Sequence, residues 1–188
     1  LYRYHYFFTF QNDKLDMKKV FFDKMGADYE RLEEFAFMVF LGFSKEAQDV
    51  IPPTELQIFL TKAFADKDAL RLLSIEKEEY KKQLFSLYKD NIIDQYYGLK
   101  IQYLYPFISG QDFTYVPSPY LVINAVTESM LNRITLGDGK LRRAIGKEVI
   151  EGYLYDIVSQ LDSVTWVSPE IEYRKGKDKL LTSDVIAA

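Results

Sequence analysis

Asp184 stands at the start of a short apolar segment, a setting in which a carboxylate could bind a metal ion. The residues after it, Val-Ile-Ala-Ala at 185–188, are predicted to form a buried strand, and Asp is depleted in strands. An acid in this position either caps a turn or is held at a sheet edge for a cation. Mg²⁺ usually takes one or two protein carboxylates, and it can neutralise a phosphate and generate hydroxide for phosphodiester hydrolysis. Asp184 therefore has two alternative roles, as a metal ligand in hydrolysis or as a turn cap.

A second acid, Glu151, lies on a predicted helix over 141–161. At about 100° per residue, Glu151 falls at the rim of the apolar face of this helix, and Glu148 points nearly opposite that face. The predicted buried face consists of Ile150, Tyr153, Leu154, Ile157 and Leu161. An acid at the rim can reach a cleft without full burial. Glu151 is therefore the candidate functional acid, with a plain surface position as the alternative, and Glu148 is assigned to solvent or to the charge of the helix start.

The segment between the helix and Asp184 is strongly charged and is predicted to form a hairpin over 169–179. Glu170 and Glu172 fall on one strand face, and lysines follow at 175, 177 and 179. No Glu-x-Lys triplet results. Glu170 is at most an accessory acid.

The order of helix, hairpin and acid-headed strand resembles the front half of the restriction-endonuclease-like, or PD-(D/E)XK, nuclease core. In that family a helix carrying a Glu precedes a hairpin, and an Asp at a strand start helps to bind the metal. Gly146, Glu151 and Tyr153 match the helix, and Ser183 stands where the family name has Pro. The resemblance implies Asp184 as catalytic metal ligand, Glu151 as catalytic helper, Mg²⁺ as cofactor, and a role in cutting nucleic acid such as defence against foreign DNA.

In the family the second carboxylate and a lysine come from the next strand, and no acid or lysine follows Asp184 in this chain. We therefore expect a truncated domain from a longer protein, and a chain that is itself inactive. We also expect the Glu151 and Asp184 carboxylates to lie close enough to share a metal ion or a water.

Basic residues gather beside these acids although the chain as a whole carries a net charge of −4. Residues 133–147 carry +4 and residues 174–179 carry +3, so the remainder of the chain is strongly acidic. Such a distribution suits a phosphate-bearing partner, and solvated helix ends and a hairpin tip are the alternative. The residues predicted to bind nucleic acid are Arg142, Arg143, Lys147, Arg174, Lys175, Lys177 and Lys179.

Composition excludes several kinds of site. The 188 residues include no Cys and a single His, His5, which rules out disulfides, thiolate catalysis, Cys-ligated zinc and Ser-His machinery. The 15 Tyr and 14 Phe can build a large core. The longest apolar run, 35–41, is too short to cross a bilayer, so the predicted compartment is the cytoplasm.

The predicted fold class is α+β and predominantly helical. Residues 1–10 alternate aromatic side chains as a strand would, a turn follows at 11–14, and 14–22 is either a second strand or a helix. Helices are predicted over 28–42, 44–50, 54–64 and 75–88, and a further helix is predicted to begin at Asp66 or Asp68. Asp28 and Ser44 are predicted N-caps, and 54–57 is predicted to be a capping box.

The second half begins with a predicted hairpin of strands 99–105 and 113–116, followed by helices over 120–134 and 141–161. We therefore predict a helical module over 1–97 and the start of a restriction-endonuclease-like domain over 98–188. The rival hypothesis is a non-catalytic interaction or regulatory module whose N-terminal helices bind a protein partner.

Overall fold

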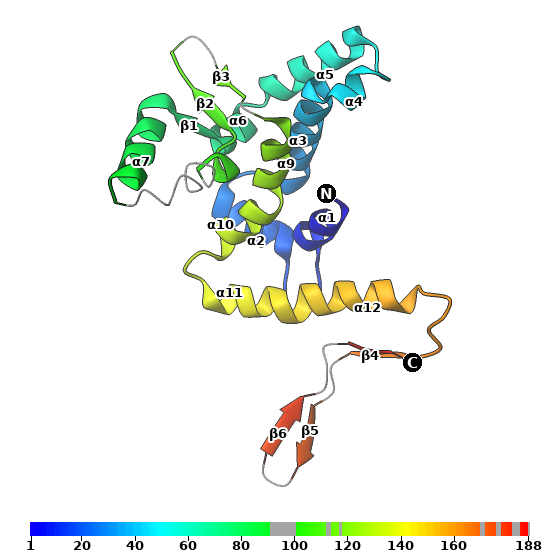
Figure 1. The fold of residues 1–188 in the computed structure, drawn as a ribbon. Coiled ribbons are helices and arrows are strands. Elements are labelled where there is room, and N and C mark those ends of the chain that lie inside the picture. Colours follow the sequence, from blue (N-terminus) through cyan, green and yellow to red (C-terminus); the bar gives the residue numbers. More distant parts are fainter. Residues whose placement is uncertain are drawn as a thin grey trace.

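The computed structural model describes residues 1–90, 101–111, 114–116, 118–169, 172–175, 178–181 and 185–187. The fold is α+β and predominantly helical, as predicted, with a helical body, one long helix below it and strands beyond that helix (Figure 1).

The first ten residues contradict the prediction of a strand, because Tyr2–Thr9 forms helix α1. Six of these ten residues are Tyr or Phe, so their spacing fits a helix as well as the alternation of a strand. The rings of Tyr4 and Phe7 lie 5.8 Å apart, and those of Tyr6 and Phe10 lie 5.9 Å apart. The neighbours Phe7 and Phe8 are both buried, which an amphipathic strand does not allow. Tertiary packing thus decides between two patterns that the sequence supports equally.

The helices that follow show that 14–22, where the sequence left strand and helix open, is helical from Met17, and they otherwise agree with the predicted periodicity. They are α2 (Met17–Met25), α3 (Tyr29–Phe43), α4 (Lys45–Gln48), α5 (Pro53–Ala65), α6 (Lys67–Leu73) and α7 (Lys77–Asp90). The side chains of Asp28, Ser44 and Asp66 accept hydrogen bonds from the first backbone N–H groups of α3, α4 and α6. The predicted capping box at 54–57 is wrong, because Pro53 already occupies the first turn of α5.

A three-stranded sheet joins the two halves of the chain. Strand β1 (Ser74–Glu76) pairs in parallel with β2 (Phe107–Ser109), which pairs antiparallel with β3 (Thr114–Tyr115). The predicted hairpin therefore exists, but its first strand is β2, and residues 101–104 are helical. Phe107 fixes this position because its ring is fully buried against Phe35 and Phe64.

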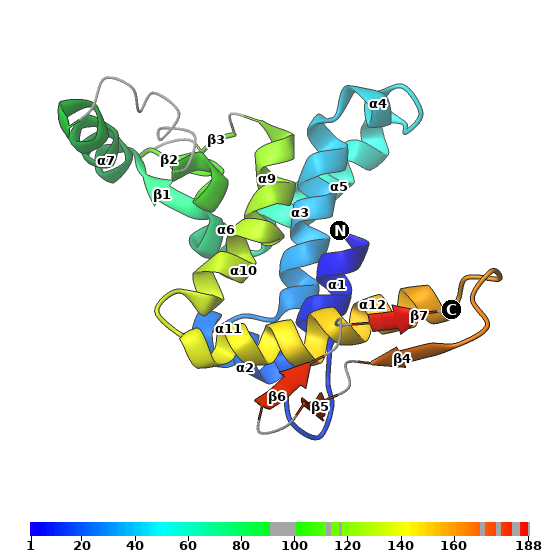
Figure 2. The ribbon, with the colours of Figure 1, turned by 60° about the horizontal axis from the view of Figure 1, so that its bottom comes forward.

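The helix predicted over 120–134 is two helices, α9 (Pro119–Val126) and α10 (Glu128–Thr135). The break falls at Thr127, whose φ and ψ are −106° and −108° and whose hydroxyl donates to the carbonyl of Ile123. The break lets α9 pack along α3 while α10 runs on to the long helix (Figure 2).

The long helix consists of α11 (Gly139–Ala144), the π-helical turn η2 (Ile145–Ile150) and α12 (Glu151–Ser159). In η2 the N–H of Glu151 donates to the carbonyl of Gly146, five residues earlier. Beyond α12, β4 (Val167–Pro169) pairs antiparallel with β7 (Val185–Ala187), and β5 (Glu172–Lys175) pairs antiparallel with β6 (Asp178–Leu181). The charged hairpin and the apolar strand are therefore confirmed.

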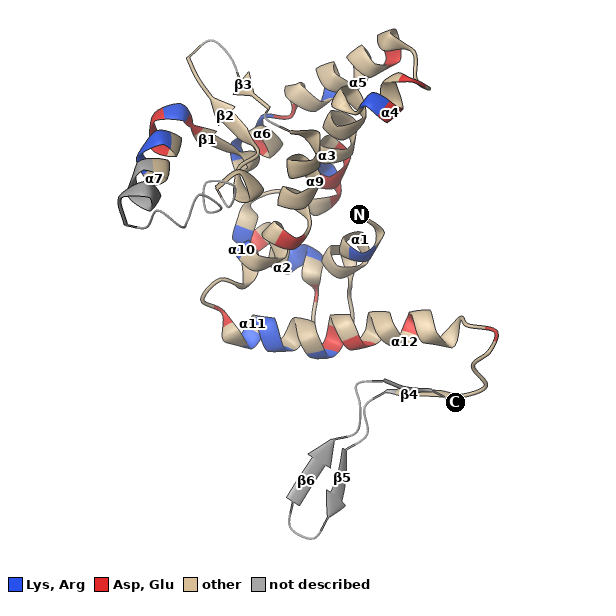
Figure 3. Cartoon of the chain, viewed as in Figure 1, with Lys and Arg blue, Asp and Glu red and all other residues tan. Residues whose placement is uncertain are grey.

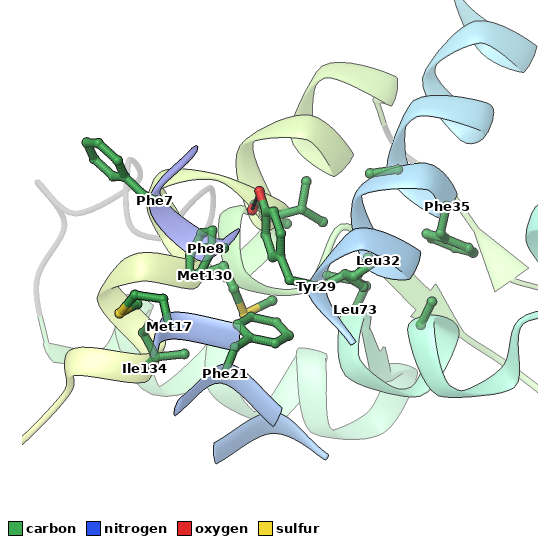
Figure 4. Packing of buried hydrophobic residues seen from close by; sticks show 14 of the residues in the cluster. Phe7, Phe8, Met17, Phe21, Tyr29, Leu32, Phe35, Leu73, Met130 and Ile134 are labelled. Atoms are coloured by element: carbon green, nitrogen blue, oxygen red, sulfur yellow. Dashed lines mark hydrogen bonds between the residues drawn. The ribbon is translucent and has the colours of Figure 1, made fainter. Parts of the chain in front are cut away.

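One buried cluster runs through the helical body (Figure 4). Phe8 stacks on Tyr29 with ring centroids 4.1 Å apart, and Phe21 meets both rings edge-on. The cluster also takes in Met130 of α10 and Val149 of η2. Residues from both predicted segments, 1–97 and 98–188, thus share one core. None of the described helices is both long and apolar enough to cross a membrane.

Candidate nucleic-acid interface

The long helix is fixed to the body by aromatic contacts with α1. The hydroxyl of Tyr6 donates to Asp156 Oδ2 at 2.8 Å, and the Tyr6 and Tyr153 ring centroids lie 5.2 Å apart. Phe7 meets Tyr153 edge-on at 5.5 Å. Burial, and then the hydrogen bond to Asp156, raise the pKa of Tyr6 to about 12. This contact decides which side of α12 faces the protein.

The predicted buried face of this helix is wrong in most positions. The side chains that enter the core are Leu141, Ile145 and Val149, with Tyr153 partly buried. Of the predicted set, Ile150, Leu154, Ile157 and Leu161 are between 37% and 50% exposed. The helix carries two apolar rows, and its packing against the core and α1 covers one of them. Hydrophobic periodicity alone could not make that choice.

Glu148 is not a solvent-facing acid, contrary to the prediction. Its side chain is 16% exposed and accepts hydrogen bonds from Asn12 Nδ2 at 3.0 Å and Lys14 Nζ at 3.2 Å. Burial raises the pKa of this carboxyl, but the bonds from Lys14 and Asn12 outweigh burial, so the pKa is lowered overall. Glu148 therefore attaches the turn between α1 and α2 to η2.

The basic side of the long helix lies away from the core. Lys140, Arg142, Arg143 and Lys147 are all exposed, and α11 shows as a run of basic residues in Figure 3. Within the described part of the chain, none of the four side chains has a recorded hydrogen bond or salt bridge. Lys140, Arg143 and Lys147, at spacings of three and four, share one helix face. Lys140 was missing from the predicted binding set, and this spacing is the signal that identifies it.

The other charges of segment 133–147 have structural roles. Arg133 is half-buried, donates to the carbonyl of Leu72 at 3.0 Å and lies over the ring of Tyr105 at 5.1 Å. Burial lowers its pKa. Asp138 caps α11 by accepting from the N–H of Leu141, and its other carboxylate oxygen pairs with Lys24 of α2 at 2.9 Å. The backbone bond is the main cause of its lowered pKa. The one acid of this segment is thus engaged away from the exposed cations.

Glu151 is partly buried and begins α12, one turn after Lys147. Helix α12 runs beside β4 and β7, and β7 begins one residue after Asp184 (Figures 1 and 2). Asp184, Glu170 and Lys177 lie outside the described residues. Arg174, Lys175 and Lys179 belong to β5 and β6, whose backbone alone is described. The shared site of Glu151 and Asp184 therefore stays a prediction.

No metal centre can be assembled from the part of the chain that the structure describes, where no three His, Cys, Asp or Glu side chains converge. Comparisons of the chain with protein-family models, with curated proteins and with solved structures found no match.

Proposed function

We propose that the chain binds the phosphate backbone of nucleic acid through the exposed face of Lys140, Arg143 and Lys147, with Arg142 beside it. The supporting observation is the lack of salt-bridge partners for these cations among the described residues, while the nearby Asp138 is held by Lys24. Cations that are not neutralised by a salt bridge can replace the counterions of a phosphate backbone. The face is on a helix whose other side is anchored in the core, so it is rigidly presented.

The proposal includes the front part of a Mg²⁺-dependent nuclease. Asp184 and Glu151 provide carboxylate oxygens, which suit Mg²⁺, and two carboxylates with several waters make an ordinary Mg²⁺ shell. The metal would neutralise the reacting phosphate and supply hydroxide. Residues 185–188 contain no further acid or lysine. We therefore expect the 188-residue chain to leave plasmid and single-stranded DNA uncut with Mg²⁺. A longer protein that adds an acid and a lysine should cut DNA with Mg²⁺, and Asp184→Asn should remove most of that activity.

Binding is tested by charge reversal. The variant Lys140→Glu/Arg143→Glu/Lys147→Glu is compared with Lys77→Glu/Lys81→Glu/Lys82→Glu, which makes the same charge change on exposed positions of α7. Three phosphate contacts predict a slope of log K against log salt of about −2.7 for duplex DNA, measured by fluorescence anisotropy. The first variant should lose binding, and the second should stay within about twofold of the parent chain, because non-specific affinity comes from the phosphates that a protein contacts. Equal losses in both variants, or none in the first, refute this assignment of the face.

A further inference from the structure

The second half of the outward side of the long helix is apolar. Ile150, Leu154 and Ile157 follow one another at spacings of four and three, Leu161 lies just beyond the end of α12, and each of the four is between 37% and 50% exposed. We call these four residues the outer row. The opposite side of the same helix is occupied by the core and by the Tyr6–Asp156 contact. A contiguous exposed apolar row on a well-anchored helix is typical of a docking surface.

We propose that the outer row, together with the cations of α11 and η2, docks an amphipathic helix of a protein partner that carries apolar residues along one half and acidic residues along the other. The spacing of the outer row is that of a heptad seam, which receives the side chains of another helix. Trp166, 50% exposed, directly precedes β4, which packs against α12. Its exposed ring is an aromatic side chain that a partner could use as an anchor.

Charge complementarity determines the acidic half of the partner. In η2 the side chains of Ile145 and Val149 are buried whereas those of Lys147 and Ile150 are exposed, so the cations and the outer row both lie on the outward side of the helix. The long helix from Gly139 to Ser159 is about 32 Å long at about 1.5 Å per residue, which is the length of a partner helix of about 21 residues. A helix placed along the whole stretch faces apolar groups at one end. At the other end it faces three cations that form no salt bridge with any described residue. Acidic residues opposite the cations would favour binding and speed association.

Two other occupants use this surface less well. A second copy in parallel alignment places cations against cations, and a second copy in antiparallel alignment over the same length places cations against the apolar row. A planar bilayer would meet the β5–β6 hairpin first, because this hairpin extends away from the long helix on the side opposite to α1 (Figure 1). Both occupants remain outcomes of the test.

The test uses synthetic helical peptides of about 21 residues with Leu at heptad positions. In two of the peptides, the half that faces the cations carries Glu; this half is N-terminal in one peptide and C-terminal in the other. Two matched peptides carry Lys at the same positions. Binding is followed by the emission of Trp166, the single Trp of the chain. The better Glu peptide should bind at least about tenfold more tightly than either Lys peptide, a difference of about 1.4 kcal/mol. Leu154→Ser/Ile157→Ser should weaken it at least about tenfold, and the control Val50→Ser/Ile58→Ser, at residues still more exposed, should not.

Several results overturn the proposal. They are equal affinity for Glu and Lys peptides, binding that survives Leu154→Ser/Ile157→Ser, and self-association in sedimentation that this variant abolishes. Partition onto phosphatidylserine–phosphatidylcholine vesicles that the variant abolishes also overturns it, in favour of a membrane surface. The same variant should still bind duplex DNA. If the parent chain binds the Glu peptide but does not bind duplex DNA, only the proposed function is refuted.

Discussion

The contact between Tyr6 and Asp156 sets the orientation of the long helix, and its contribution can be isolated by Tyr6→Phe. The substitution removes the hydroxyl that donates to Asp156 at 2.8 Å and keeps the ring that packs on Phe10 and Tyr153. A hydrogen bond to a charged group contributes about 1.5–3 kcal/mol when buried, and this one is at the protein surface. We expect the free energy of unfolding to fall by about 1 kcal/mol at neutral pH.

The pH dependence gives a second measure of the same contact. The pKa of Tyr6 rises from 10.0 to about 12 on folding, so the neutral phenol is favoured in the folded state. Its contribution is fully present below pH 10 and is lost as the pH rises towards about 12. Two pKa units correspond to a ceiling of about 2.7 kcal/mol, and solvent screening at this surface contact reduces it to about 1 kcal/mol. The difference between the parent chain and Tyr6→Phe should therefore shrink at alkaline pH.

The assay is urea unfolding of the parent chain, Tyr6→Phe, Asp156→Asn and the double variant at about pH 7 and about pH 11. Comparing variants at each pH cancels the ionisation of the other tyrosines. Tyr153→Phe is the control, because within the described residues the Tyr153 hydroxyl has no recorded hydrogen bond and only ring contacts hold this side chain. A Tyr6→Phe chain as stable as the parent at neutral pH, or a difference that grows at alkaline pH, would show that the hydroxyl does not stabilise the helix.

Two further substitutions test other contacts by the same unfolding measurement. Gly42→Ala should lower the free energy of unfolding by about 1–3 kcal/mol, because the added Cβ would overlap the side chain of Leu60 on α5. In the control Gly146→Ala, the added Cβ meets nothing within 4 Å, so the change should be neutral or stabilising by up to about 1 kcal/mol. Equal effects of the two substitutions would refute the close α3–α5 contact. Glu148→Gln should lower the free energy of unfolding by about 1 kcal/mol at neutral pH and by little in acid, because a carboxyl with a lowered pKa loses its stabilising contribution as the pH falls. The control is Glu55→Gln, at an exposed position of α5, which should change the stability little at either pH.

Features determined by neighbouring residues could be predicted from the sequence, and features determined by distant contacts could not. Asp28 and Ser44 cap their helices as predicted because a cap needs only the next three backbone N–H groups. The helical state of α1 depends on Tyr29 and Tyr153, far along the chain, and the aromatic pattern allowed a strand equally well.

The same distinction applies to the candidate site. The exposed cations of α11 follow from local charge and spacing, so the sequence identified most of them. The role of Glu148 depends on Lys14, 134 residues earlier, and no pattern within the helix indicates it. The outer row was visible as an apolar stripe, but its exposure depends on the position of α1 on the other side of the helix.

The contact of α1 with α12 has a consequence for synthesis of the protein on the ribosome. Tyr6 and Asp156 are 150 residues apart. At about 5–20 residues per second, α1 emerges roughly 8–30 s before the helix against which it packs. During that time Phe8 can already stack on Tyr29, but Phe7 has no Tyr153 to cover it. Until residue 156 has left the exit tunnel, the nascent chain therefore exposes apolar surface of α1, and transiently exposed surface of this kind favours aggregation.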